Sequence, residues 1–286
     1  MPYEAEISRR NPTAFFFVID QSFSMSEPVG GAQSSKSVML ATVVNRLLNE
    51  LYIRAQKGDE VWDYYDIAMI GYGNARYGST YVGSAFGGTL QGRSVVQIHE
   101  VADYPIRIDT RKKKEYDATG QLIEIDVEFP IWLEPEFNGG TPMAEAMAYT
   151  YNMVADWVIK HPDSFPPIVI HVTDGEPSDG QDPRPAAEAI RGLATNDGNV
   201  LMFTLHLSKE DAGSIVFPSD QGKLPNVFAK MLYEMSSTMP DRWQVMAAEK
   251  MGVPIQPNAR AFVYNANIEK MILFLEIGTR PPTDNN

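Results

Sequence analysis

Oxygen-bearing side chains in three short polar segments of this sequence are the residues best suited to chemistry. Asp20, Ser22 and Ser24 form a D-x-S-x-S motif, Thr141 lies in a Gly-Gly-Thr-Pro segment, and Asp174 lies in a Thr-Asp-Gly segment. Two carboxylates and three hydroxyls, with no thiolate or clustered imidazole among them, suit a hard cation such as Mg²⁺. The residue types therefore predict a divalent-cation site made of these five residues.

The apolar segments before the two aspartates have the composition of buried β-strands. Residues 14–19 form a continuous apolar run that ends at Asp20, and residues 167–173 form a run that ends at Asp174. A third run covers residues 65–72. Such runs are typical of parallel strands with helices on both faces. Because ligands of these sheets bind beyond the carboxyl ends of the strands, we expect the polar segments to meet there.

Amphipathic segments alternate with these strands and predict helices. One helical stripe is formed by Leu40, Val43, Val44, Leu47, Leu48 and Leu51. A second helix is expected to begin with Thr141 as its N-cap and Pro142 at its first position, and to reach His161. The later elements are expected as helices at about 185–193, 224–236 and 268–275 and strands at 200–207 and 261–264. This alternation predicts an α/β fold with a doubly wound, mostly parallel central sheet flanked by helices.

Residues 73–135 interrupt the alternation. They begin with glycine-rich segments, and residues 106–129 hold two β-like runs on either side of Asp117-Ala118-Thr119-Gly120. The second run alternates apolar and acidic residues, which predicts a half-exposed strand and a β-hairpin at a sheet edge. The sequence has no internal repeat and no low-complexity linker. We therefore expect residues 1–286 to form a single domain, with a core at about 14–278 and an insertion at about 73–135.

The three polar segments resemble the metal-ion-dependent adhesion site (MIDAS) of the von Willebrand factor A (VWA) family, bacterial cytosolic type. They occur in that family's order and on that family's elements. The resemblance implies that Ser22, Ser24 and, in ligand-engaged states, Thr141 bind Mg²⁺ or Mn²⁺ directly. Asp20 and Asp174 would act mostly through water, and a partner's Glu or Asp would fill the sixth coordination position.

Phe23 departs from the pattern of the family, in which a small residue, usually glycine, separates the two serines. A bulky ring at this position could strain the loop or stand over the metal. It could equally form an apolar anchor for a partner. The departure bears on metal occupancy more than on the fold.

Composition limits the classes of partner. The formal net charge of −13 disfavours nucleic acid and anionic membranes as partners. The absence of cysteine excludes disulfides, thiolate zinc sites and a cysteine nucleophile. The basic run at residues 111–114 is expected to form a solvated turn or edge. The N-terminus lacks the pattern of a secretory signal, and residues 14–19 are too few to span a membrane, so a cytoplasmic protein is expected.

The resemblance implies a metal-dependent protein–protein interaction module, and not an enzyme, in a multi-protein bacterial stress or defence system. AAA-type ATPases, protein kinases and phosphatases are the partner classes it implies. One alternative is a Mg²⁺-dependent phosphatase-like hydrolase with Asp20 as nucleophile. Such enzymes have a second aspartate two residues later, where this chain has Ser22. Another alternative is a metal-free structural module, which would follow if Phe23 abolished the site.

Polar residues close to Asp174 have simpler interpretations. His171 lies inside an apolar strand, so we expect a hydrogen-bonded core histidine rather than a metal ligand. The acidic residues Glu176, Asp179 and Asp182 are expected to be solvated, with the alternative that one of them assists the metal. An aspartate followed by glycine is by itself a common turn pair. The combination of three segments, and no single one, predicts the site.

Overall fold

An eight-stranded sheet forms the centre of the computed structural model, which describes residues 2–29, 33–73, 81–116, 120–208, 213–252 and 254–280. Its strands are β1 (Thr13–Asp20), β4 (Tyr65–Tyr72), β5 (Val82–Ser84), β6 (Val96–Gln97), β9 (Ile168–Thr173), β12 (Leu201–Leu207), β13 (Ile215–Val216) and β14 (Phe262–Ala266). Their order is β13-β14-β12-β9-β1-β4-β5, and β6 also pairs with β4. The five strands from β14 to β4 run parallel, and β5, β6 and β13 are antiparallel to their neighbours. The predicted α/β fold with a mostly parallel sheet is confirmed.

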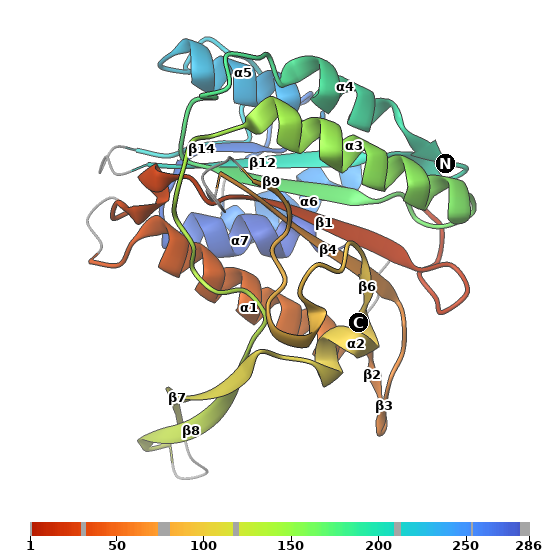
Figure 1. Cartoon of the computed structure of the whole chain (residues 1–286), viewed down its shortest axis with the longest axis vertical. Helices are drawn as coiled ribbons and strands as arrows, with labels where there is room; N and C mark the ends of the chain where they lie inside the picture. Colours follow the sequence, from red (N-terminus) through yellow and green to blue (C-terminus); the bar gives the residue numbers. More distant parts are fainter. Residues whose placement is uncertain are drawn as a thin grey trace.

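Helices cover both faces of this sheet (Figure 1). They are α1 (Lys36–Ala55), α2 (Ile98–Asp103), α3 (Met143–Lys160), α4 (Arg184–Gly192), α5 (Val227–Met235), α6 (Asp241–Met251) and α7 (Ile268–Gly278). Side chains of α1, α6 and α7 pack on one face, and side chains of α3, α4 and α5 pack on the other. The sequence did not predict α6, because only Trp243, Ala247 and Met251 of this helix are buried. None of the helices in the described residues is long and apolar enough to cross a membrane.

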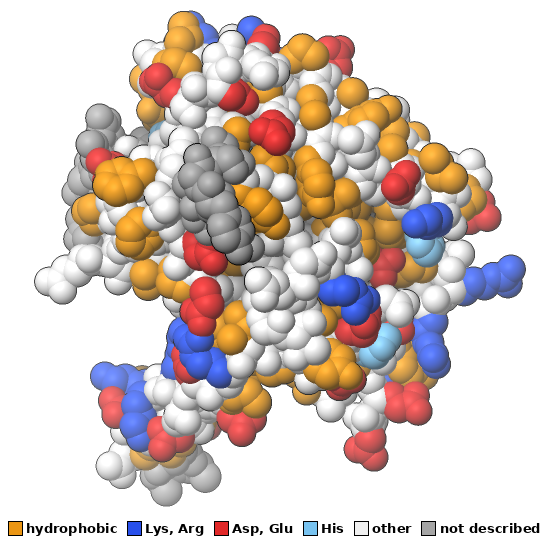
Figure 2. Space-filling view, in the orientation of Figure 1, with side chains coloured by type: hydrophobic (Ala, Val, Ile, Leu, Met, Phe, Trp, Pro, Cys, Tyr) orange, Lys and Arg blue, Asp and Glu red, His pale blue; other side chains and the backbone are white. Residues whose placement is uncertain are grey.

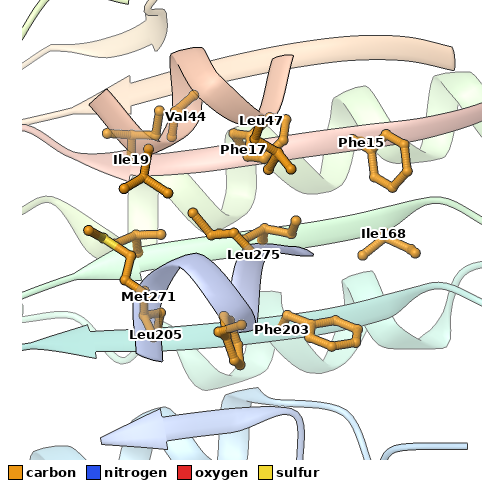
Figure 3. Close-up of a cluster of buried hydrophobic side chains, with 14 of the residues drawn as sticks. Phe15, Phe17, Ile19, Val44, Leu47, Ile168, Phe203, Leu205, Met271 and Leu275 are labelled. Atoms are coloured by element: carbon orange, nitrogen blue, oxygen red, sulfur yellow. The ribbon is translucent and has the colours of Figure 1, made fainter. Parts of the chain in front are cut away.

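Alternation along β1 divides the core into two layers. Phe15, Phe17 and Ile19 face α1 and α7, together with Phe203 and Leu205 of β12 (Figure 3). The intervening residues of β1 join the layer under α3, α4 and α5. Burying each large apolar side chain contributes roughly 1.5–3 kcal/mol. A strand that is buried on both faces holds its carboxyl end rigidly, and β1 ends at Asp20.

The insertion contains the predicted hairpin, formed by β7 (Arg107–Tyr116) and β8 (Leu122–Ile131). Its location differs from the prediction: the two strands form a sheet of their own, which extends away from the body of the protein (Figure 1). The edge of the central sheet next to β4 is instead occupied by β5 and β6, also from the insertion. Residues 117–119 of the predicted turn lie outside the described residues. The remaining short elements are β2 (Gln56–Lys57), β3 (Glu60–Val61), β10 (Ala194–Thr195), β11 (Gly198–Asn199) and the 3₁₀ helices η1 (Phe23–Ser26) and η2 (Gly88–Leu90).

The basic run at residues 111–114 lies on β7 and is largely exposed, as predicted. Lys112 pairs with Asp126 of β8 at 2.6 Å, and Lys114 lies 3.9 Å from Glu124. Side chains of both charge signs therefore gather on the hairpin (Figure 2). The acidic strand balances the basic one, so the hairpin presents no uniform positive surface.

Candidate metal centre

The carboxyl ends of β1 and β9 lie side by side and position the first group of candidate residues. Ile19 pairs with Val172 in register, so the next residues, Asp20 and Thr173, emerge together. The hydroxyl of Thr173 donates to Oδ2 of Asp20 at 2.6 Å. The chain runs from β1 to β4 on one side and later enters β9 on the other side. The topological switch therefore lies between β1 and β9, where ligands of open α/β sheets bind.

Backbone hydrogen bonds bring the Gly-Gly-Thr-Pro segment against the serine loop. The N–H of Phe23 donates to the carbonyl of Gly139 at 3.1 Å, and the N–H of Asn138 donates to the carbonyl of Gln21 at 2.7 Å. Gly73, at the end of β4, allows this close approach. It has a φ of 108°, and a Cβ there would lie 2.6 Å from the carbonyl oxygen of Gly140 and 2.8 Å from the nitrogen of Ser22. The serine loop, the Gly-Gly-Thr-Pro segment and the end of β4 thus meet so closely that position 73 has no space for a side chain.

Four of the five predicted residues form one hydrogen-bonded cluster. The backbone N–H of Ser22 donates to Asp20 Oδ1 at 2.9 Å, and the Oγ atoms of Ser22 and Ser24 are 3.1 Å apart. The hydroxyl of Ser24 donates to Asp174 Oδ1 at 2.7 Å, across 150 residues of sequence. Ser24 therefore links the motif after β1 to the motif after β9.

Thr141, the fifth residue, approaches the same cluster. A Cβ on Gly175 would lie 3.6 Å from Ser24 Oγ and 3.7 Å from Thr141 Oγ1, so both hydroxyls border the same point. The prediction that Thr141 caps α3 is wrong, because the helix begins at Met143 and Pro142 is its N-cap. Ser178 instead fixes the backbone of Thr141: its Oγ accepts from the N–H of Thr141 at 2.5 Å, and its own N–H donates to the carbonyl of Thr141 at 3.0 Å. Among the described residues, the hydroxyl of Thr141 makes no hydrogen bond of its own and can accept a ligand.

The two carboxylates of the cluster are buried. Asp20 is 1% exposed. Burial, and then the neighbouring charge of Asp174, raise the pKa of Asp20 to about 6, although hydrogen bonds from Ser22 and Thr173 oppose the increase. The side chain of Asp174 is fully buried and binds the ammonium of Lys36, whose Nζ is 2.6 Å from Oδ2. The protein thus places a cation of its own against one of the predicted metal-site carboxylates.

The donor set fits a hard divalent cation. The five predicted side chains all offer oxygen atoms. Asp174 Oδ1 accepts a hydrogen bond from Ser24, and its Oδ2 binds the ammonium of Lys36. Hydroxyl ligands are essential to this fit, since no three His, Cys, Asp or Glu side chains of the described residues are grouped so that they could hold a metal. Ser22, Ser24 and Thr141 would hold such a cation through their hydroxyls, while Asp20 binds the backbone N–H of Ser22 and Asp174 binds the hydroxyl of Ser24.

The other polar residues near Asp174 have structural roles. His171 is a buried core histidine, as predicted: its Nε2 is 2.7 Å from the hydroxyl of Tyr72, and burial lowers its pKa to about 3. Asp179 Oδ2 accepts from the N–H of Ala144 in the first turn of α3. Asp182 pairs with Arg184 at 2.8 Å. None of these three side chains joins the cluster.

Sequence reasoning missed three residues that support the cluster: Lys36, Thr173 and Ser178. Lys36 had a detectable signal, because it precedes Leu40 by four residues and so extends the apolar stripe of α1. A lysine on a buried face needs a buried counter-ion. Thr173 is the last residue of a buried strand next to Asp174, which marks it as a neighbour of the site. Nothing in the sequence distinguishes Ser178 from an ordinary loop serine.

No protein-family model and no curated protein matches this chain. Solved structures similar to it include proximal thread matrix protein 1 from the mussel byssus, with 11% identity, a TM-score of 0.46, and coverage of 96% of this chain and 48% of that one. A structure of the same mussel protein with a zinc-occupied MIDAS motif has 11% identity, a TM-score of 0.42, and coverage of 80% and 42%. The PilB minor pilin from Streptococcus sanguinis has 10% identity, a TM-score of 0.47, and coverage of 96% and 62%. This chain thus spans less than two thirds of the length of these proteins, and similarities this low carry no argument about its function.

Proposed function

We propose that this chain is a VWA-type interaction module that binds a Glu or Asp of a partner protein through Mg²⁺ or Mn²⁺. The residues that would hold the metal are Asp20, Ser22, Ser24, Thr141 and Asp174. The observation that carries the proposal is the hydroxyl of Ser24, which lies 3.1 Å from Ser22 Oγ and 2.7 Å from Asp174 Oδ1. Segments far apart in the sequence thereby present oxygen donors to one point. Bound Mg²⁺ supplies a coordination position that an incoming carboxylate can occupy.

Two exposed aromatic rings beside the cluster support a role in protein recognition. Phe23 is 68% exposed and Phe137 is 46% exposed. They belong to the two loops that are joined by the hydrogen bond from Asn138 to Gln21. Because the ring of Phe23 points to solvent, it leaves the hydroxyls of its neighbouring serines in place. An apolar rim beside a charged, directional contact is a common composition of interaction hot spots.

The phosphatase-like alternative is less well supported. A nucleophilic aspartate needs an accessible oxygen, whereas Asp20 is 1% exposed. Both of its carboxylate oxygens accept hydrogen bonds, from the N–H of Ser22 and the hydroxyl of Thr173. These contacts suit a residue that organises a loop rather than one that attacks a phosphate. The partner classes, namely AAA-type ATPases, kinases and phosphatases, rest on the family resemblance, and the cytoplasmic setting rests on the sequence pattern of the N-terminus.

Titration calorimetry with Mg²⁺ and Mn²⁺ tests the proposal at its first step. The wild-type protein should bind one ion, and Ser24→Ala should bind it much more weakly. The second step is a pull-down in Mg²⁺ and in EDTA, with the wild-type protein and with Thr141→Ala. A folded protein that binds no ion at millimolar concentration would refute the metal dependence. A partner captured equally well in EDTA would refute the carboxylate contact.

A further inference from the structure

Lys36 is a buried cation inside the candidate metal centre. It is the first residue of α1, and its side chain is 3% exposed. Its Nζ lies 2.6 Å from Asp174 Oδ2, 3.2 Å from Glu27 Oε2 and 3.4 Å from the carbonyl oxygen of Ser24. All three contacts are to oxygen atoms of the candidate centre or of the loop that carries its serines. The ammonium group therefore occupies an oxygen-lined position of the kind that cations take.

This contact has two consequences for the centre. A fully buried Asp174 carboxylate is expensive to desolvate, and Lys36 compensates its charge in the absence of any metal. The same positive charge repels a divalent cation that approaches the oxygens of Ser24 and Asp174. Lys36 thus stabilises the assembled serine loop and lowers the affinity of the centre for a divalent cation.

We propose that Lys36 is a built-in counter-ion that competes with the divalent cation for Asp174 and so limits the affinity of the centre for Mg²⁺. The proposal rests on the proposed function, since it concerns the same metal. It adds a residue outside the D-x-S-x-S, Gly-Gly-Thr-Pro and Thr-Asp-Gly segments to the centre. In this arrangement the serine loop stays ordered without Mg²⁺, because Lys36 binds both Asp174 and Glu27.

Lys36→Met tests the competition, since methionine keeps an unbranched chain and removes the charge. The matched control is Lys57→Met, which removes the same charge from the exposed strand β2. By calorimetry, Lys36→Met should bind Mg²⁺ on the order of tenfold more tightly than the wild type and the control. In EDTA its melting temperature should fall by on the order of 5–10 °C, because Asp174 loses its counter-ion. Added Mg²⁺ should reverse most of this fall in melting temperature.

A second neutral variant, Lys36→Gln, can still donate a hydrogen bond to Asp174. It keeps the test valid if Lys36→Met does not fold. It too should bind Mg²⁺ more tightly than the wild type. If the neutral variants fold and their Mg²⁺ affinity equals that of the wild type, the competition is refuted while the proposed metal dependence stands. If the wild type and both variants bind no Mg²⁺, the proposed metal dependence fails, and the competition fails with it. Binding by the neutral variants alone would support Lys36 as the cation that excludes the ion.

Discussion

The hydroxyl of Thr173, at the end of β9, donates a 2.6 Å hydrogen bond to Oδ2 of Asp20, at the end of β1. The N–H of Ser22 donates to the other carboxylate oxygen at 2.9 Å. Asp20 therefore joins two neighbouring strands to the loop that holds the serines. A carboxylate used in this way fixes the geometry of hydroxyl ligands and has no oxygen directed at solvent.

The first prediction from this arrangement is that the protein has no phosphatase or ATPase activity. We expect assays with p-nitrophenyl phosphate and with ATP, each in Mg²⁺ and in Mn²⁺, to give background rates. A buried Asp20 with both oxygens engaged cannot attack a phosphate without the loss of two hydrogen bonds. Metal-dependent hydrolysis that disappears in Asp20→Asn would instead establish the phosphatase-like alternative.

Stabilisation by metal is expected to depend on Ser24. When the Mg²⁺ concentration is ten times the Kd of the folded protein for Mg²⁺, the ion should stabilise the wild type by about 1.4 kcal/mol. The reason is that the unfolded chain does not bring the oxygen atoms of the centre together. In a chain of this size that corresponds to a rise in melting temperature of about 3 °C. Ser24→Ala should lose the rise, since its hydroxyl contacts both Ser22 and Asp174. Ser26→Ala, in the same 3₁₀ helix, is the matched control and should keep it.

Much of the candidate centre could be predicted because local sequence and strand topology agree. Apolar runs that end at Asp20 and Asp174 are strands buried on both faces, and parallel strands bring their carboxyl ends together. The Gly-Gly-Thr-Pro segment suggested Thr141 as a site residue, and the separate expectation that Thr141 is the N-cap of α3 is wrong. Its hydroxyl does not cap α3, and its backbone is held by Ser178 instead. Contacts between loops of this kind leave no periodic signal in a sequence.

The unpredicted parts depend on long-range contacts. The hairpin of β7 and β8 has a strong local pattern of alternating side chains. That pattern does not indicate whether the hairpin joins the central sheet or forms a sheet of its own. Helix α6 buries only three of its eleven residues, so its buried apolar stripe is narrow. Lys36 lies on the apolar stripe of α1, but its partner Asp174 is 138 residues away. A charge on a buried face predicts that a counter-ion exists without identifying it.

Gly73→Ala should destabilise the protein and also weaken Mg²⁺ binding. The new Cβ would lie 2.6 Å from the Gly140 oxygen and 2.8 Å from the Ser22 nitrogen, so the two loops must separate. We expect a loss of more than about 2 kcal/mol in the free energy of unfolding, measured by urea denaturation. Gly58→Ala is the control: Gly58 also has a positive φ but has no atom within 4 Å of the new Cβ. It should lose only about 1 kcal/mol, through backbone strain. Equal losses in the two variants would contradict the close packing at Gly73.

His171 should make the protein sensitive to acid. Burial lowers its pKa from the ordinary value of 6.5 to about 3, so below pH 6.5 the unfolded chain binds a proton that the folded protein does not. Stability is therefore lost as the pH falls from 6.5 towards 3, at up to about 1.4 kcal/mol per pH unit. Asp20, whose pKa is raised to about 6, acts in the opposite direction between pH 6 and 4.

The comparison with His171→Gln isolates the histidine from Asp20, since the variant retains Asp20. Urea denaturation in EDTA at several pH values gives the difference in free energy of unfolding between the two proteins. That difference should shift steadily in favour of the variant as the pH falls below 6.5. A difference that stays constant with pH would show that His171 does not titrate on unfolding.

Partner binding should depend separately on the metal and on the exposed ring of Phe23. Thr141→Ala and EDTA should each greatly reduce binding, because both remove the coordination of the partner's carboxylate. Phe23→Ala should weaken binding by about 1–2 kcal/mol without changing the Kd for Mg²⁺, since the ring is 68% exposed and contributes apolar contact only. Tyr116→Ala is the control, because Tyr116 is 73% exposed but lies on the hairpin, away from the cluster. If Tyr116→Ala weakened binding and Phe23→Ala did not, the recognition surface would be the hairpin of β7 and β8.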